Sequence, residues 1–217
     1  MSGSLAGLSD SSIRASLAPY GPVPDAHLCE AVRTYIDILL RWNRRMSLTT
    51  VSAPEEILRF HIGESIAAIS IADIRDGRLA DVGSGAGFPG IPLAVFVPGL
   101  EVILIESNTK KAAFLSEAIR ALSLANAHVF RGRYATLKTS PDSGLQFITA
   151  RALGSYDDLL TWSASVLNWG GRAVLWLGAG DARQIAQVSK WAWCSPRGIV
   201  GTKSRVILVG QPRTSTH

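Results

Sequence analysis

The stretch LADVGSGAGFPGIPLAVFVPGLEVILIE, residues 79–106, decides the fold. Residues 79–82 are apolar except for one aspartate, which is typical of the end of a buried strand. Three glycines alternate with small residues directly after it: Gly83, Gly85 and Gly87. Such spacing predicts a turn that needs positive φ angles or a close backbone approach, both of which glycine tolerates.

The second half of this stretch completes a βαβ unit. A short helix is expected from about Ile91, and residues 102–105 are a β-branched, apolar run that ends in Glu106. An acidic residue at the tip of the second strand of such a unit commonly binds ribose hydroxyls in doubly wound sheets.

Two classes of cofactor fit the glycine turn. Residues 85–90, GAGFPG, match the GxGxxG fingerprint of dinucleotides, and residues 81–87, DVGSGAG, match the DxGxGxG pattern of S-adenosylmethionine methyltransferases. Asp81 would repel a pyrophosphate but attract the ammonium and sulfonium of S-adenosylmethionine, and Pro89 and Pro92 remove backbone N–H groups that would bind phosphate. We therefore favour the methyl donor over a dinucleotide or a turn without ligand.

Size and composition indicate an ordinary globular chain. It has 217 residues, 47% hydrophobic and 18% charged, and a net charge of +5 that permits a polyanionic partner. The two cysteines, Cys29 and Cys194, lack metal-type spacing, so we expect no metal site and a buried, reduced Cys29. No secretory signal or membrane-spanning run is apparent, so we expect a cytoplasmic monomer that does not bind membranes.

Helices are expected before residue 76. A first helix would end at Leu17, capped by Asp10 or Ser11, and an amphipathic helix follows over residues 25–45. Three arginines crowd its end, where either the helix dipole or contact with RNA explains them: Arg41, Arg44 and Arg45. Residues 52–55, SAPE, predict a capping box that starts another helix.

Strands and helices alternate through the rest of the chain. We expect strands at residues 127–130, 145–150 and 172–177, and helices at residues 109–122, 155–167 and 181–190, with a closing hairpin over residues 191–209. Ser107, Asn108 or Thr109 would cap the first of these helices. The alternation predicts an α/β fold with a mostly parallel sheet, as a domain over residues 76–217 that follows a helical extension over residues 1–75.

Four blocks of sequence resemble one known family. They are RWN with LT at residues 41–49, HIGESI at residues 61–66, DVGSGAGFPGIPL at residues 81–93, and a set of short matches between residues 106 and 152. In this order they resemble the glucose-inhibited division protein B (GidB, or RsmG) family, which methylates guanine N7 in bacterial 16S ribosomal RNA. The resemblance covers roughly residues 35–155, and its FPGIP segment is more specific than its glycines.

The resemblance implies a Rossmann-like class I S-adenosylmethionine-dependent methyltransferase that acts on 16S rRNA in the small ribosomal subunit. It implies that Arg151 faces the reactive cleft as the catalytic residue. The implied cofactor-binding residues are Asp81, Gly83, Ser84, Gly85, Gly87, Phe88, Glu106, Ser107, Tyr134, Ala135 and Arg151. The implied RNA-contacting residues are His61, Lys110, Lys111, Arg131 and Arg133.

The chain departs from the family pattern at several positions. Ser47 and Glu64 stand where the family commonly has Asn and Asp, and residues 134–135 differ from its usual apolar-acidic pair. The usual lysine is missing near residues 177–180. Two other functions remain as alternatives: an RNA-binding module that holds S-adenosylmethionine without catalysis, and an NAD-dependent oxidoreductase.

No residue is expected to act as an obligatory general base. Guanine N7 carries a free lone pair on the Hoogsteen edge, so no proton must leave before it attacks a methyl group. His61 is therefore expected to position substrate at most, and a structural role on its helix is the alternative.

Overall fold

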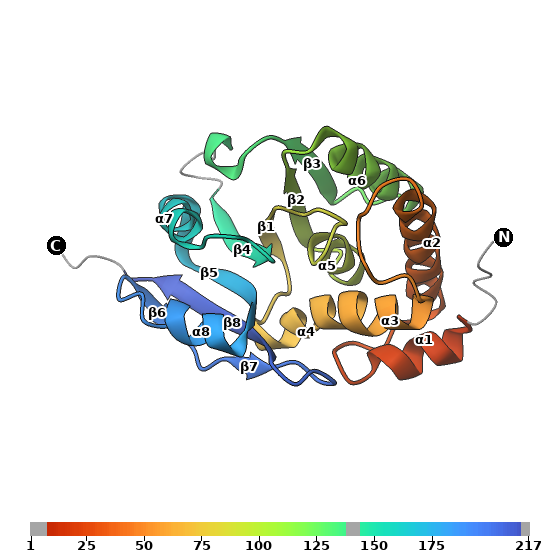
Figure 1. Ribbon diagram of the computed structural model, residues 1–217, viewed down its shortest axis with the longest axis horizontal. Helices are drawn as coiled ribbons and strands as arrows, with labels where there is room; N and C mark the ends of the chain where they lie inside the picture. The colour runs from red at the N-terminus through yellow and green to blue at the C-terminus, as the bar shows by residue number, and fades with distance from the viewer. Residues whose placement is uncertain (1–7, 138–143, 214–217) are drawn as a thin grey trace.

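A twisted sheet, mostly parallel, forms the centre of the computed structural model, which describes residues 8–137 and 144–213 (Figure 1). Its strand order is β3-β2-β1-β4-β5-β8-β6, with β7 also paired to β8. The strands from β3 to β5 are parallel, and β8 is antiparallel to its neighbours. The strands are β1 Gly77–Val82, β2 Leu100–Glu106, β3 Ala127–Arg131, β4 Leu145–Arg151, β5 Leu167–Gly178, β6 Trp191–Trp193, β7 Arg197–Gly198 and β8 Arg205–Pro212. Because the strand order reverses between β1 and β4, a ligand site is expected outside the carboxyl ends of these two strands.

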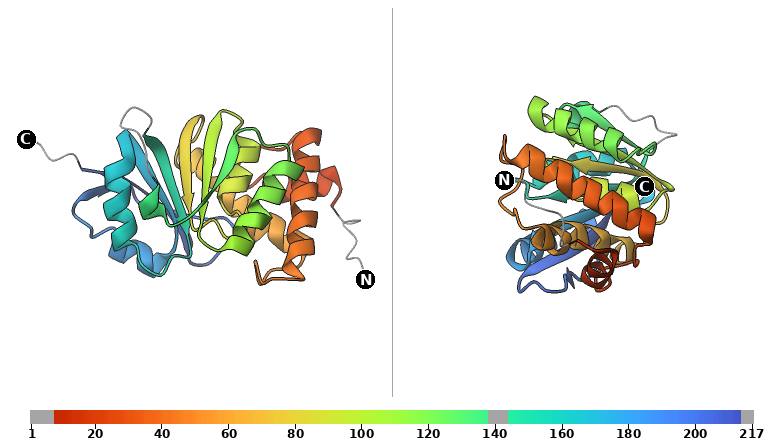
Figure 2. Two further views of the ribbon diagram at one scale, coloured as in Figure 1. Left: turned by 90° about the horizontal axis from the view of Figure 1, so that it is seen from above. Right: turned by 90° about the vertical axis from the view of Figure 1, so that its right-hand side faces the viewer.

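Helices cover both faces of the sheet, with α7 on one side and α6 and α2 on the other (Figure 2). Side chains alternate between these faces along each strand. In β2, Val102 and Leu104 belong to the buried cluster under α4, α5 and α6, whereas Ile103 and Ile105 belong to the cluster under α7 and α8. The helices are α4 Glu64–Ile71, α5 Gly90–Phe96, α6 Thr109–Ala121, α7 Asp157–Val166 and α8 Ala179–Ile185, with the 3-10 helix η3 Tyr134–Thr136 after β3.

The N-terminal helices share the core of the sheet domain. Ile36 of α2 (Ala26–Asn43) and Leu17 of α1 (Asp10–Leu17) belong to the same buried cluster as Leu79 of β1. The predicted division at residue 75 stays a prediction, but one continuous core crosses it.

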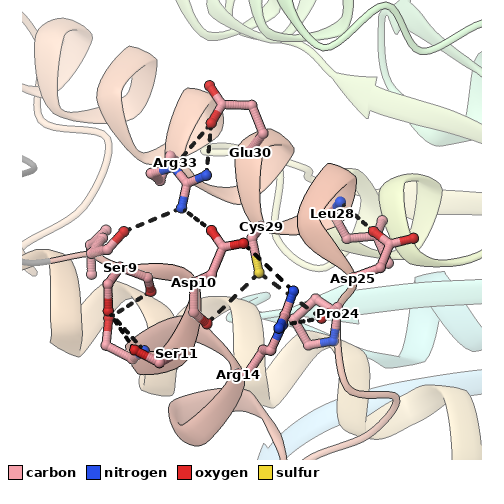
Figure 3. A network of polar contacts seen from close by, with 12 residues as sticks. Ser9, Asp10, Ser11, Arg14, Pro24, Asp25, Leu28, Cys29, Glu30 and Arg33 are labelled. Atoms are coloured by element: carbon pink, nitrogen blue, oxygen red, sulfur yellow. Dashed lines mark hydrogen bonds and ion pairs between the residues drawn. The ribbon is translucent and has the colours of Figure 1, made fainter.

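A polar network ties α1 to α2 (Figure 3). Arg33 lies 2.7 Å from Asp10 and 2.8 Å from Glu30. Cys29 is free and buried beside them, as predicted, and burial together with Asp10 raises the pKa of its thiol. The network therefore fixes the first helix against the second.

Two of the predicted helix starts are wrong. Ser9, rather than Asp10 or Ser11, caps α1, because its side chain accepts from the backbone of Ser12 at 3.2 Å. The expected capping box does not form: α3 (Pro54–Ile57) begins after Ala53 without a side-chain cap. The chain then widens into the π-helix η2 (Leu58–Gly63), which the sequence pattern did not indicate.

Other boundaries follow the predictions more closely. Asn108 caps α6, with its Oδ1 accepting from the backbone N–H groups of Lys110 and Lys111 at 3.0 and 3.1 Å. The helix expected to reach residue 190 ends at Ile185, because the backbone of Gln187 turns back to Gln184. The expected antiparallel hairpin over residues 191–209 is confirmed: its first half forms two short strands, β6 and β7, which both pair with the long strand β8. Within the described part of the chain, no helix is long and apolar enough to cross a bilayer.

Candidate active site

The glycine turn at the end of β1 is held tightly by its backbone. Gly83, Gly85 and Gly87 have φ angles of 70°, 54° and 87°, so the predicted need for positive φ is confirmed. The N–H groups of Gly83 and Ser84 both donate to the carbonyl of Ile105 in β2, at 2.9 and 3.1 Å. The turn is therefore positioned by the neighbouring strand.

Asp81 lies under this turn and lines none of the cavities described below. It is 1% exposed, its Oδ1 accepts from Thr149 Oγ1 at 2.9 Å, and its Oδ2 accepts from the Gly90 N–H at 3.3 Å. Burial raises its pKa to about 6, against the lowering effect of these hydrogen bonds. Asp81 thus braces the turn from below and connects β1, β4 and α5.

The start of α5 is poorly suited to a pyrophosphate. The Gly90 N–H is taken by Asp81, the Ile91 N–H donates to the Gly87 carbonyl at 2.8 Å, and Pro89 has no N–H. Dinucleotide-binding turns present free N–H groups at this place. The geometry therefore disfavours an NAD-binding site.

A cavity of about 760 Å³ opens beside the turn, between β2, η3 and α7. We call it the adenosine cavity. Its wall includes five of the predicted cofactor-binding residues: Gly83, Glu106, Ser107, Tyr134 and Ala135. Arg133, predicted to contact RNA, also lines it.

Glu106 occupies the tip of β2, as expected. Its Oε2 accepts from the Gly85 N–H at 3.0 Å and its Oε1 from the Asn108 N–H at 2.7 Å. A carboxylate offers about four lone-pair sites, so two remain for a ribose diol.

The opposite wall of the adenosine cavity comes from α7 and from Leu153 before it, and was not predicted. Its α7 residues are Asp158, Thr161, Trp162 and Ser165, and the Trp162 ring lies 5.1 Å from that of Tyr134. No motif marks these residues, since α7 reaches the site only through the crossover from β4 to β5. The available signal in the sequence was Trp162, an aromatic residue on the helix that follows the strand ending in Arg151.

A second cavity, of about 440 Å³, lies on the other side of the glycine turn, and we call it the loop cavity. It brings together residues from the second, third and fourth blocks of the sequence: His61, Ser84, Gly85, Phe88, Lys111 and Arg151. Residues 47–50, which follow α2, also line it. Lys111 and Arg151 make it cationic, and none of the described residues that line it carries a carboxylate.

His61 is held in the loop cavity as a neutral ring. Its Nε2 lies 2.8 Å from Thr49 Oγ1, and its ring packs on Phe88 with centroids 4.6 Å apart. Nδ1 lies 3.0 Å from the Phe60 carbonyl and 3.3 Å from Arg151 Nη2. Burial, followed by the positive charge of Arg151, lowers the pKa of His61 to about 4.

Arg151, at the carboxyl end of β4, is part of a buried ion-pair chain. Its Nη2 lies 3.1 Å from Glu64 Oε2, and Glu64 Oε1 accepts from Arg205 of β8 at 2.6 Å. Burial raises the pKa of Glu64, whereas Arg151 and Arg205 lower it. Burial lowers the pKa of Arg151, whereas Glu64 raises it. Two buried atoms of this pair nevertheless have no hydrogen-bond partner in the part of the chain that the structure describes: Glu64 Oε2 and Arg151 Nη1.

A third cavity, of about 460 Å³, lies over the ends of β4 and β5, and we call it the β4–β5 cavity. Glu64, Arg151, Trp176, Asp181 and Arg205 are among its lining residues. Gly178, near which the family's lysine is missing, also lines it. At this place Asp181 contributes a negative charge instead.

Four predicted site residues lie outside all three cavities: Asp81, described above, and Gly87, Lys110 and Arg131. Gly87 packs inward, where an added Cβ would lie 2.7 Å from Tyr35 Oη. Lys110 and Arg131 are exposed near the same edge of the sheet. Of the arginines that end α2, Arg41 pairs with Asp37 at 2.9 Å, which supports a structural explanation for that residue.

Solved structures with this arrangement include methyltransferases. A SAM-dependent methyltransferase from Aquifex aeolicus matches 71% of this chain and 92% of its own at a TM-score of 0.60 and 15% identity. MtNAS, in complex with MTA and tNA, matches 97% of this chain and 84% of its own at a TM-score of 0.61 and 12% identity. The fold is therefore that of class I S-adenosylmethionine-dependent methyltransferases.

Sequence relatives are more specific. The ribosomal RNA small subunit methyltransferase G of Stenotrophomonas maltophilia (strain K279a) is 35% identical over 192 residues, which are 86% of this chain and 89% of the relative. The protein of the same name from Xylella fastidiosa (strain M23) is 40% identical over 156 residues, 71% of each chain. The family model "rRNA small subunit methyltransferase G" matches residues 28–197. By this match over most of its length, the chain belongs to the rRNA small subunit methyltransferase G (GidB) family.

Proposed function

We propose that this protein transfers a methyl group from S-adenosylmethionine to N7 of a guanine in 16S ribosomal RNA. The observation that carries the proposal is the adenosine cavity, in which Glu106 stands beside the glycine turn, in a chain that belongs to this family. The absence of a membrane-spanning helix among the described residues agrees with action on ribosomal RNA in the cytoplasm, where we propose that the protein works as a monomer.

The residues present fit the methyl donor. Glu106 has two free lone-pair sites for a ribose diol, and Tyr134 and Trp162 offer rings beside the space for an adenine. Lys111 and the Ser84 and Gly85 backbone line the loop cavity, where a methionine carboxylate would meet positive charge. Asp81 supports the turn rather than contacting this end directly.

S-adenosylmethionine supplies an electrophilic methyl group. The N7 lone pair forms the new bond to this methyl carbon while the electrons of the broken C–S bond return to sulfur, so the positive charge passes to the base. The protein's part is to align the base and exclude water. Arg151 lines both the loop cavity and the β4–β5 cavity, so it orients both partners. The base must leave its stack to enter, because folded RNA hides its edges.

The decisive experiment is incubation with radiolabelled S-adenosylmethionine and small ribosomal subunits that lack the modification, followed by mapping of the labelled base. We expect one guanine to be labelled at N7. Binding of the cofactor without transfer to any RNA would favour the non-catalytic RNA-binding alternative. Fluorescence titration with NADH tests the oxidoreductase alternative, and we expect no binding.

A further inference from the structure

We propose that the β4–β5 cavity receives the target base and identifies it as guanine, with Arg151 donating to O6, Glu64 accepting from N1–H and Asp181 accepting from the N2 amino group. This inference rests on the proposed function and names the subsite that this function requires. A cavity of about 460 Å³ is large enough for a nucleoside.

The position of the cavity suits the acceptor. It shares Leu153 with the adenosine cavity, and Arg151 and Ala152 with the loop cavity. Ala152 has a φ of 57°, a left-handed conformation that is uncommon for alanine. Arg151, before this turn, also lines the loop cavity, and Leu153, after it, also lines the adenosine cavity. The three cavities therefore meet at residues 151–153.

Charge distinguishes the two cavities in which a base might be placed. Among its described lining residues the loop cavity has Lys111 and Arg151 but no carboxylate, which suits the carboxylate of the cofactor. The β4–β5 cavity has two carboxylates, Glu64 and Asp181, together with two arginines. Guanine presents N–H donors at N1 and N2, and a carboxylate is their strongest acceptor among side chains.

Two unpaired buried atoms agree with this assignment. Arg151 Nη1 is a donor without a partner, and Glu64 Oε2 is an acceptor that lies 3.1 Å from Arg151 Nη2 yet accepts no hydrogen bond. Unsatisfied buried polar groups are costly and usually have a functional reason. Guanine carries an acceptor, O6, directly beside a donor, N1–H. The Arg151 donor would therefore pair with O6, and the Glu64 acceptor with N1–H.

The order of groups along the base then assigns Asp181. O6, N1 and N2 follow one another along the same edge of guanine, so once Arg151 and Glu64 take the first two, N2 requires a further acceptor. Asp181 is exposed, lines the cavity and forms no hydrogen bond or ion pair with the described residues. N7 remains free to react.

The alternative explanation of Asp181 is structural, because it stands in the first turn of α8 and an acid there interacts favourably with the helix dipole. Asp157 provides a matched control. It is also exposed, stands in the first turn of α7 and lines none of the three cavities.

The test compares small-subunit rRNA that carries guanosine or inosine at the methylated nucleotide. Inosine keeps N7, O6 and N1–H but lacks the N2 amino group. We expect wild type and Asp157→Ala to lose about ten- to a hundredfold in kcat/KM on inosine, the size of a charge-assisted hydrogen bond. Asp181→Ala should lose a similar factor on guanosine and no longer distinguish the two nucleotides.

Sinefungin binding by calorimetry should be equal in all three proteins, which shows that the cofactor cavity and the fold are intact. If Asp181→Ala keeps the wild-type preference for guanosine, or slows both substrates equally, the assignment of N2 is wrong. That result differs from failure of the proposed function, in which wild type labels no base in small-subunit rRNA.

Discussion

Glu106 accepts backbone N–H groups from Gly85 and Asn108 and lines the adenosine cavity, where we propose that it binds the ribose. Removal of the carboxylate should lose charge-assisted bonds to the ribose. We expect Glu106→Ala to weaken S-adenosylmethionine binding by about ten- to a hundredfold in calorimetry. Glu101→Ala, at the other end of β2, is the control, and equal affinities for both variants would contradict the assignment.

Asp81 makes stability depend on pH in an unusual direction. Burial raises its pKa from 3.8 to about 6, so the folded protein binds this proton more tightly than the unfolded chain does. Wild type should therefore gain stability relative to Asp81→Asn as the pH falls from about 6 to 4, by up to about 3 kcal/mol. Urea unfolding of both proteins at several pH values measures this difference, and a difference that does not change with pH would show that the carboxyl group titrates normally.

His61 should not titrate in the working range of the protein. Its pKa is lowered to about 4, and N7 needs no base. The single-turnover rate of methyl transfer should be nearly flat between about pH 6 and 8, and His61→Ala should reduce kcat/KM by less than roughly a hundredfold. A tenfold rise per pH unit that His61→Ala abolishes would instead identify His61 as the base.

At the scale of the elements, the glycine turn leaves no room for a side chain at Gly87. Gly87 has a φ of 87°, and a Cβ there would lie 2.6 Å from Ile91 Cδ1. We expect Gly87→Ala to lower the free energy of unfolding by about 2–4 kcal/mol through backbone strain and overpacking. Gly180→Ala in α8 meets nothing within 4 Å, and should be neutral or stabilising by up to about 1 kcal/mol in the same denaturant assay.

The elements that were predictable from the sequence are those with strong local signals. The apolar runs of β1, β2 and β4 and the Asn108 cap of α6 each depend on residues close together in the chain. The prediction of a capping box at residues 52–55 was wrong, because α3 begins at Pro54 without a side-chain cap and the chain enters a π-helix four residues later. That π-helix places the Phe60 carbonyl where Arg151 Nη2 donates to it at 3.0 Å, a contact between residues 91 positions apart that no local pattern encodes.

At the scale of the whole molecule, the glycine side of the site was predictable and the far side was not. Motifs marked Gly83, Glu106 and Arg151 because their chemistry depends on strand ends. Trp162 and Asp181 lie on helices that reach the site only when the sheet is assembled. The unpredicted walls are those made by the tertiary fold.

The charge of the molecule provides the last prediction. Lys110, Lys111, Arg131 and Arg133 lie near the carboxyl edge of β2 and β3, and none forms an ion pair with the residues that the structure describes. Cations left unpaired beside the site are suited to RNA phosphates, and each contact releases about one counterion. Replacement of each by alanine should therefore lower the slope of log binding constant against log salt by up to about one unit.

The control for this series is Arg120→Ala, which removes the same charge from the opposite, C-terminal end of α6. Filter binding of small-subunit rRNA at several salt concentrations should give Arg120→Ala the wild-type slope, since its distance from the site leaves the phosphate contacts unchanged. If all five variants keep that slope, the four cations are an ordinary solvated surface. If Arg120→Ala lowers it as much as the others, net charge rather than position governs the binding of RNA.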